Sequence, residues 1–344
     1  MPRAPKEVSL PMVAREAGCC VKAASLALQH SKGSSVLVSR VQAAAKKLGY
    51  IPVVRSTSTK EIILLAPLDY NPGLYIDICE QISQFFHSNR HGNYSIIRIN
   101  MSNVVLSPLL ETEALNHAIG LRPAGIVLIA PTSAGSVDQL HRSRIPAVVV
   151  NNRIIHHEIP NVCIDNQRGI EQAVDHLVGL GHVAIAYLHG PKSATSEQER
   201  GTAYELAMKK HKLELNQDYM ISLSAGQNPR FQAGYNGCEI LLGKINRPTA
   251  IIAYNDAMAM GAILALKNND VTIPDDMSII GCDDLPFGSF TIPRLTTVGI
   301  NIGDLAERVG DLLLSRLGAV EKAKINDPIV SSLTIRETTD RAPI

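Results

Sequence analysis

Apolar runs alternate with amphipathic segments along this chain from residue 62 onward. Four unbroken runs rich in Val, Ile and Leu come first, at 62–67, 94–99, 125–130 and 147–152. Such runs are typical of strands that are buried on both faces of a parallel sheet. The segments between them have helical spacing, at 74–90, 109–121 and 136–142. The pattern predicts a βαβ sheet with helices on its faces.

The same alternation starts again near residue 183. Further apolar runs lie at 183–188, 219–223, 250–254 and 278–282. Helical segments separate them, at 200–211, 231–242 and 257–268. Two successive units of this kind predict an α/β body of two lobes, each a doubly wound parallel sheet. Since ligands of such sheets bind beyond the carboxyl ends of the strands, we expect a binding cleft between the lobes.

The first 60 residues have a different pattern. The Ser9 side chain is expected to cap the first helix by accepting from an amide of its opening turn, and Pro11 suits that turn. The helix should end at Gly18, a residue that tolerates the left-handed backbone of a helix end. Two more short helices are expected at about 21–28 and 38–48. The body is therefore preceded by a small all-α domain.

Charge separates this domain from the body. The formal net charge of +1 is distributed unevenly. Residues 1–60 contain 10 Lys and Arg against 2 Asp and Glu, and the rest of the chain contains 23 Lys and Arg against 30 Asp and Glu. A basic head on an acidic body favours a polyanionic partner for the head alone.

Several function classes find no support in the sequence. The opening residues contain no apolar signal segment, and no run reaches the roughly 18 apolar residues of a membrane span. The 6 cysteines are scattered without metal-ligand spacing. We therefore expect reduced thiols, no metal, no cofactor, no membrane partner and a cytoplasmic location.

Three long segments carry a specific resemblance. Residues 249–301, 162–191 and 333–339 resemble the signature of the LacI/GalR family of bacterial transcriptional regulators, and 9–29 resembles its helix-turn-helix. The resemblance extends from about Val8 to Thr339. It implies a body like the periplasmic binding proteins and a homodimer on operator DNA.

The resemblance also implies domain limits. The helix-turn-helix domain is expected at 1–52 and a linker with a degenerate hinge at 53–61. The N-terminal lobe would take 62–162 plus 294–326, and the C-terminal lobe 163–293 plus 327–344.

In this family the second helix of the head enters the major groove. Matching positions imply that Ser9 contacts a phosphate and that Cys20, Val21 and Lys22 contact bases or phosphates. Three more candidates lie further along the same helix face, namely Ser25, Leu26 and Gln29. Cys20 and Val21 depart from the family's polar helix start, so hydrogen-bonded base readout has fewer groups. The linker is shorter than usual and lacks the Leu that would wedge into the minor groove.

The resemblance places a small effector between the lobes. Matching positions are Asn71, Asn151, Arg200, Phe231, Asn255 and Asp283. Amides and carboxylates exchange hydrogen bonds with hydroxyls, and a guanidinium is a fork of donors, so a sugar or a similar polar metabolite suits them. Asp256 and Asp284 are expected to bond to backbone and shape their turns.

The sequence thus predicts a ligand-responsive repressor. The alternative is a sensor of the same family that has weakened or lost specific DNA binding, which the apolar start of the second helix motivates. An enzyme is disfavoured, because the adjacent Asp283 and Asp284 cannot flank a substrate and HHE at 156–158 lies in a loop. A transport solute-binding protein would need a signal peptide and no basic head.

Overall fold

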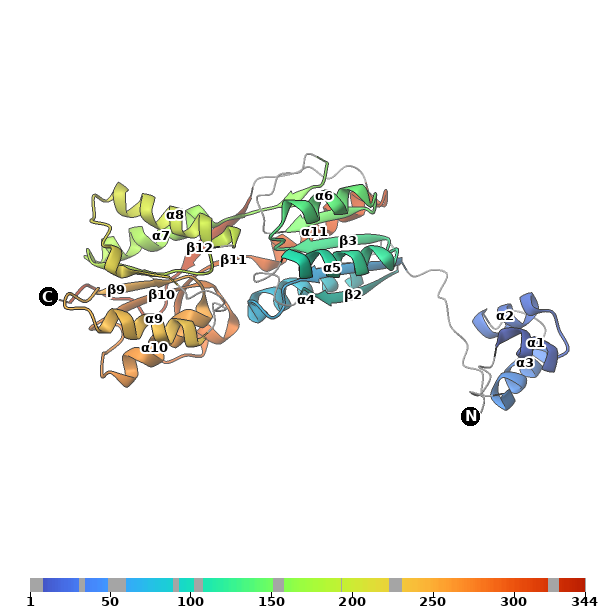
Figure 1. The fold of residues 1–344 in the computed structure, drawn as a ribbon. Helices are drawn as coiled ribbons and strands as arrows, with labels where there is room; N and C mark the ends of the chain where they lie inside the picture. The colour runs from blue at the N-terminus through green and yellow to red at the C-terminus, as the bar shows by residue number, and fades with distance from the viewer. Residues whose placement is uncertain are drawn as a thin grey trace, which may run out of the picture. The chain divides into compact units, whose positions relative to one another are not determined.

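A computed structural model describes most of the chain. The described residues are 9–30, 35–48, 60–88, 93–101, 108–150, 158–192, 194–222, 231–320 and 328–343. The chain divides into a head, Met1–Thr59, and a body, Lys60–Ile344 (Figure 1). The expected hinge and the loop after the second helix of the head fall largely outside the described residues.

The head contains the three helices that the sequence predicts. They are α1 (Leu10–Glu16), α2 (Val21–His30) and α3 (Ser35–Leu48). Small side chains form their shared core, namely Val13, Ala14, Ala17, Ala24, Ala27, Val41, Ala44 and Ala45. Because alanine methyl groups occupy little volume, the three helices pack at short range with few atoms between them.

The two ends of α1 are stabilised differently. At its C-terminal end Gly18 has φ of +62°, and Arg40 of α3 donates to the carbonyls of Ala17 and, at 3.2 Å, of Gly18. At its N-terminal end the expected cap is wrong, since the Ser9 side chain makes no cap hydrogen bond. Pro11 removes one amide of the first turn, and the Met12 amide bonds to the Ser9 carbonyl oxygen at 2.9 Å instead.

The first lobe is built on a five-stranded parallel sheet in the order β2-β1-β3-β4-β5. Its strands are β1 (Lys60–Ala66), β2 (Tyr94–Asn100), β3 (Gly125–Ile129), β4 (Ala147–Val150) and β5 (Asn161–Val162). Ile62 of β1 lies opposite Ile96 and Gly125 in its neighbours. The strand begins at Lys60, inside the linker that the sequence analysis expected to reach residue 61, because the Lys60 amide bonds to the Asn93 carbonyl at 3.0 Å.

Helices cover both faces of this sheet (Figure 1). Ile62 and Leu64 face a core shared with α4 (Pro72–Ser88) and α11 (Ile302–Arg316). Ile63 and Leu65 face a second core shared with α5 (Pro108–Gly120) and α6 (Ala134–Arg142). Each fully buried side chain of this kind contributes roughly 1.5–3 kcal/mol by leaving water. Burial on both faces explains why the run from 62 to 66 is unbroken.

The second lobe has a seven-stranded sheet in the order β6-β12-β11-β10-β9-β7-β8. These strands are β6 (Ile164–Asp165), β7 (Ile185–Leu188), β8 (Met220–Ile221), β9 (Ala250–Ala253), β10 (Ser278–Asp283), β11 (Thr296–Ile300) and β12 (Ile329–Thr334). Its helices are α7 (Asn166–Gly179), α8 (Thr195–Lys210), α9 (Phe231–Leu242) and α10 (Asp256–Asn268). Short 3-10 turns lie at Gln217–Tyr219 and Pro286–Ser289.

Two expectations about this sheet are wrong. Residues 296–300 were assigned to the N-terminal lobe, but β11 pairs with β10 in the second lobe. The sheet is also not wholly parallel, since β12 runs antiparallel to β11. The direction of the chain explains this, because β11 leads out of the second lobe towards α11 and β12 leads back into it.

Within the described residues, no helix combines the length and the apolar character that a membrane crossing requires.

Close contact between α9 and α10 depends on two glycines. A Cβ added at Gly234 would lie 1.9 Å from the Met258 carbonyl oxygen, and one at Gly261 would lie 1.9 Å from the Phe231 carbonyl oxygen. Since these neighbours are backbone, the helices would have to separate.

We expect Gly234→Ala to lower the free energy of unfolding of the body by about 1–3 kcal/mol, the usual cost of overpacking. Urea denaturation of the full chain measures the change. Gly120→Ala is the matched control, because nothing lies within 4 Å of an added Cβ there. The control should keep its stability or gain about 0.5 kcal/mol from a less flexible unfolded chain. Equal behaviour of the two variants would contradict close packing of α9 on α10.

Candidate functional site

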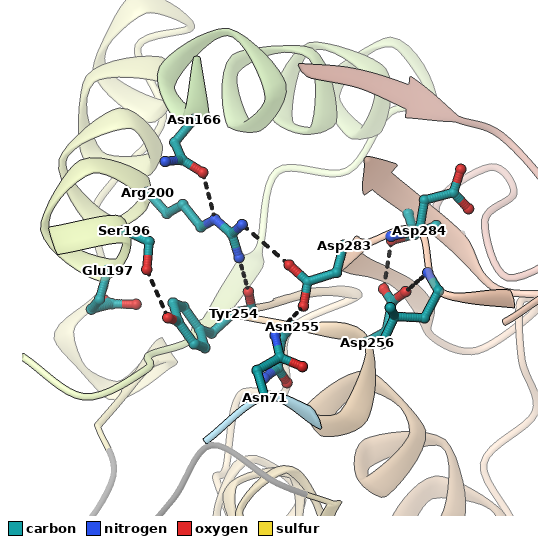
Figure 2. A network of polar contacts seen from close by, with 12 residues as sticks. Asn71, Asn166, Ser196, Glu197, Arg200, Tyr254, Asn255, Asp256, Asp283 and Asp284 are labelled. Carbon is teal, nitrogen blue, oxygen red and sulfur yellow. Dashed lines mark hydrogen bonds and ion pairs between the residues drawn. The ribbon is translucent and has the colours of Figure 1, made fainter. Parts of the chain in front are cut away.

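A hydrogen bond between buried polar side chains joins the two lobes. Asn71 lies between β1 and α4 in the first lobe, and Asp283 is the last residue of β10 in the second. The Asn71 amide donates from Nδ2 to Asp283 Oδ2 at 2.7 Å. Figure 2 shows this contact at the centre of a larger network. Both residues lie at the carboxyl ends of strands, which is the edge where the sequence predicts a binding cleft.

Arg200 of α8 organises the second-lobe side of this network. Its Nε donates to Asn166 Oδ1 at 3.0 Å and its Nη1 to the Tyr254 carbonyl at 2.6 Å. Its Nη2 lies 3.3 Å from Asp283 Oδ1. The side chains of Arg200 and Asp283 are only 12% and 1% exposed. The guanidinium thus connects the ends of β9 and β10 with α7 and α8 (Figure 2).

The electrostatics of Asp283 depend on these partners. Burial raises the pKa of its carboxyl group, while the Arg200 charge and the Asn71 hydrogen bond lower that pKa. The backbone of Asp283 has φ of +119°, a region that residues with a Cβ rarely adopt. A buried acid held in an unfavourable backbone conformation is a feature found often at functional sites.

Aromatic hydroxyl groups form a second contact between the lobes. The hydroxyl of Tyr254 lies 3.2 Å from that of Tyr70 in the first lobe and 2.8 Å from Ser196 Oγ in the second. Burial raises the pKa of the Tyr70 and Tyr254 phenols, so both are neutral and can donate as well as accept. The Arg200 guanidinium lies 5.2 Å from the centre of the Tyr254 ring.

A small hollow of about 20 Å³ lies beside these tyrosines. Both lobes line it, through Pro67, Tyr70, Tyr75, Ala130, Pro131 and Thr132 on one side and Ala194, Thr195 and Ser196 on the other. Hydroxyl groups and aromatic rings therefore meet at the boundary between the lobes.

Two further carboxylates hold the surrounding loops. Glu197 accepts from the Gly190 amide at 2.8 Å and contacts His189 Nδ1 at 2.6 Å. Asp256 accepts from the Leu285 amide at 2.8 Å, as expected, and from the Thr297 hydroxyl. Burial and then the charge of Asp283 raise the pKa of Asp256. Glu197 thus holds the loop that follows β7, and Asp256 holds the loop that follows Asp283.

The structure brings together three of the six expected effector residues, Asn71, Arg200 and Asp283 (Figure 2). Asn255 instead caps α10, where its Oδ1 accepts from the Met258 amide at 2.9 Å. Phe231 begins α9 and is 40% exposed, and no contact between described residues brings it to the network. Asn151 lies outside the described residues. Asp284 differs from expectation, since its carboxylate meets Arg336 and the Thr334 hydroxyl rather than backbone.

Four residues of the network were not predicted from the sequence, namely Tyr70, Tyr254, Ser196 and Asn166. A signal was present for three of them, because Tyr70 and Tyr254 each precede a selected asparagine and Ser196 lies one helical turn before Arg200. Asn166 gave none, because only the packing of α7 against α8 brings it to Arg200.

The head places the expected DNA-contacting residues as follows. Ser9, Cys20, Val21 and Lys22 are exposed, the last three where α2 begins. The side chains of Ser25, Leu26 and Gln29 lie outside the described part of the structure.

Two basic side chains that charge alone would assign to phosphate contacts are used inside the head. Arg40 bonds to the end of α1, and Lys47 pairs with Glu16 at 2.7 Å.

Comparisons with known proteins agree with this architecture. Residues 174–339 match the family described as periplasmic binding protein-like domain. The HTH-type transcriptional regulator GalS of Salmonella typhimurium is 29% identical over 88% of this chain and 88% of its own length. The crystal structure of the lac repressor dimer bound to operator and the anti-inducer ONPF aligns with a TM-score of 0.72 and 24% identity, over 97% of this chain and 100% of that one.

A third similar protein is a LacI family transcriptional regulator from Lactobacillus casei with bound glucose. It aligns with a TM-score of 0.69 and 24% identity, over 81% of this chain and 99% of that one. The two structural alignments establish the two-lobed fold.

The Arg200–Asp283 pair generates a stability prediction. Arg200→Met leaves a buried carboxylate without its cation, which should lower the free energy of unfolding by about 3–5 kcal/mol near pH 8. The folded pKa of Asp283 is already raised, so the stability that protonation provides is lost as the pH rises through that pKa. Removing Arg200 raises the folded pKa of Asp283 further. The destabilisation caused by Arg200→Met should therefore be smaller near pH 5 than near pH 8. Chemical denaturation at both pH values measures it.

The double variant Arg200→Met/Asp283→Asn is the control. It removes both charges, so it should be more stable than Arg200→Met alone at pH 8 and should lose the difference between the two pH values. A double variant no better than the single one would show that Arg200 acts by packing alone.

Proposed function

Because this chain belongs to the LacI/GalR family of bacterial transcriptional regulators, we propose that it is a repressor that binds operator DNA through its helical head and responds to a polar effector held between its lobes. The observation that carries the proposal is the buried Asn71–Asp283–Arg200 contact between the lobes. The similar proteins named above are transcriptional regulators, and we assign no catalytic role to this chain. We retain residues 1–52 as the DNA-binding domain and place the protein in the cytoplasm.

A sugar is the effector class that these side chains favour. Asp283, Arg200 and Asn71 combine a carboxylate, a guanidinium and an amide, which together can bond to several neighbouring hydroxyls. Tyr70 and Tyr254 add further hydroxyls and flat apolar faces that suit the C–H face of a sugar ring. We keep Asn151, Phe231 and Asn255 as proposed contacts from the family pattern.

The contact between the lobes suggests how an effector would act. Asn71 and Asp283 satisfy each other across the boundary, so a sugar hydroxyl that bonds to either one replaces this contact with another of different length. The relative position of the lobes then changes. In a dimer this would alter the separation of two heads that must reach half-sites about one helical turn apart, with a coupling of typically about 1–3 kcal/mol.

An exposed apolar loop supports the dimer. Phe287, Phe290 and Ile292 follow β10 and are 40%, 83% and 96% exposed. Large apolar side chains gathered on one surface loop are a feature of protein interfaces. We propose that this loop contributes to a homodimer.

DNA binding is tested with fragments from around the protein's own coding region, by gel shift and footprinting across a salt series. Lys22 is exposed at the start of α2, so Lys22→Ala should weaken binding to the preferred site roughly 10- to 100-fold and reduce its advantage over random DNA. Lys46, exposed in the last turn of α3, provides the matched charge control. Lys46→Ala should weaken specific and random binding alike, and the same titration should give two chains per operator.

A wild-type protein that binds all fragments equally, with salt dependence only, would contradict the repressor. That result would support the sensor with lost specific DNA binding. The exposed Cys20 and Val21 at the start of α2 favour this alternative, because neither side chain offers the paired donors and acceptors that read bases well.

The effector site is tested by thermal shift of the full chain against a panel of sugars, followed by calorimetry with the best one. Asn71→Ala removes a group at the lobe boundary and should weaken sugar affinity roughly tenfold, because a sugar hydroxyl that bonds to the Asn71 amide is left without its partner. Asn116→Ala, on the exposed surface of α5, should bind like the wild type. Equal affinity of both variants, or no response to any sugar, would contradict the assignment.

A further inference from the structure

A basic hollow lies at the opposite edge of the first lobe from the effector site. It has a volume of about 510 Å³ and is lined by Arg142, Arg144, Arg316, His141 and Glu158, with Ile145 and Ile159. Arg142 ends α6, Arg316 ends α11, and Arg144 and Ile145 lead into β4. In a parallel sheet these positions all belong to the amino edge, whereas Asn71 lies near the carboxyl edge.

The charges of this hollow favour an anion. Each helix carboxyl end carries about half a negative charge, so α6 and α11 together add about one, and Glu158 adds another. The three positive charges of the guanidinium groups exceed these roughly two negative charges. Glu158 is occupied by His141, whose Nε2 lies 3.2 Å from Glu158 Oε2. Among the described residues, no ion pair joins Arg142, Arg144 or Arg316 to a carboxylate.

Stabilisation of helix ends explains only part of the cluster. A cation in the last turn of a helix is favourable by itself, which accounts for Arg142 and Arg316. Arg144 lies beyond α6 and is exposed. Three exposed arginines around one concave surface would repel one another in the absence of a counter-ion.

We propose that this hollow is a second binding site, which takes a phosphate group. Guanidinium groups bind phosphate oxygens in pairs, and several of them around one group give specific recognition. The volume falls within the range of small-molecule sites, about 300–1,000 Å³. The phosphate would belong either to a phosphorylated metabolite or to the DNA backbone. The two sources share the same phosphate chemistry, and the experiment below distinguishes them.

The chain contains a matched control for Arg144. Arg122 follows α5 just as Arg144 follows α6, is also exposed, and has a similar left-handed backbone, with φ of 52° against 59°. Arg122 does not line the hollow. Arg144→Gln and Arg122→Gln therefore remove the same charge from the same kind of position in the same lobe.

The experiment has two arms and uses the full-length chain. In the first, inorganic phosphate and a hexose phosphate are titrated calorimetrically without DNA, at constant ionic strength. In the second, DNA affinity is measured across a chloride series. A metabolite site predicts that Arg144→Gln weakens phosphate binding at least tenfold while Arg122→Gln does not. A backbone contact predicts instead that only Arg144→Gln reduces the slope of log K against log salt, by about 0.9.

Identical behaviour of the two variants in both arms would overturn the second site. The phosphate titration needs neither DNA nor a sugar response. It therefore tests the second site even if the repressor function is wrong. Denaturation curves of both variants confirm that each folds like the wild type.

Discussion

The central constraint on the body of this protein is a buried carboxylate that lies beside a buried guanidinium. Asp283 is almost entirely removed from water, and an isolated ion in such a place costs several kcal/mol even after the protein relaxes. Arg200 from α8 and Asn71 from the other lobe offset this cost by charge and by hydrogen bonding. The compensation is shared between two lobes, so the electrostatics of one side chain connect the two halves of the body.

This arrangement explains why the neighbouring residues are polar and yet ordered. The Arg200 guanidinium donates to Asn166 on one side and to the Tyr254 carbonyl on another, which restricts its orientation. Glu197 and Asp256 stabilise neighbouring loops by accepting from the backbone amides of Gly190 and Leu285. A network in which most members have fixed partners is sensitive to a competing ligand, because exchange of one hydrogen bond changes the balance of the others.

The two edges of the first-lobe sheet have opposite chemistry. At the carboxyl edge, amide, carboxylate and hydroxyl groups meet the second lobe and suit an uncharged polar ligand. At the amino edge, three arginines surround a hollow next to the segments that lead into β4 and β5. Parallel strands make this separation possible, since every loop of one kind falls on the same edge. One lobe can therefore carry two ligand surfaces without their overlapping.

The sequence by itself determined the elements and their class. Unbroken apolar runs such as 62–66 predict strands buried on both faces, and the charge of the first 60 residues separates a basic head from the body. The family resemblance selected Asn71, Arg200 and Asp283 by their matching positions. A prediction from local sequence preferences was wrong at Ser9, where two preferences compete. Serine favours the cap position, but Pro11 removes an amide from the turn that the serine was expected to cap.

Only the tertiary structure decided which polar residues meet. The contact between Asn71 and Asp283 spans 212 positions, and Asn166 reaches Arg200 through packing of α7 on α8. The antiparallel β12 and the transfer of β11 to the second lobe follow from the path of the chain between lobes, which periodicity does not encode. Hydrophobic patterning reports which face of an element is buried, whereas the identity of its neighbour depends on how all elements pack at once.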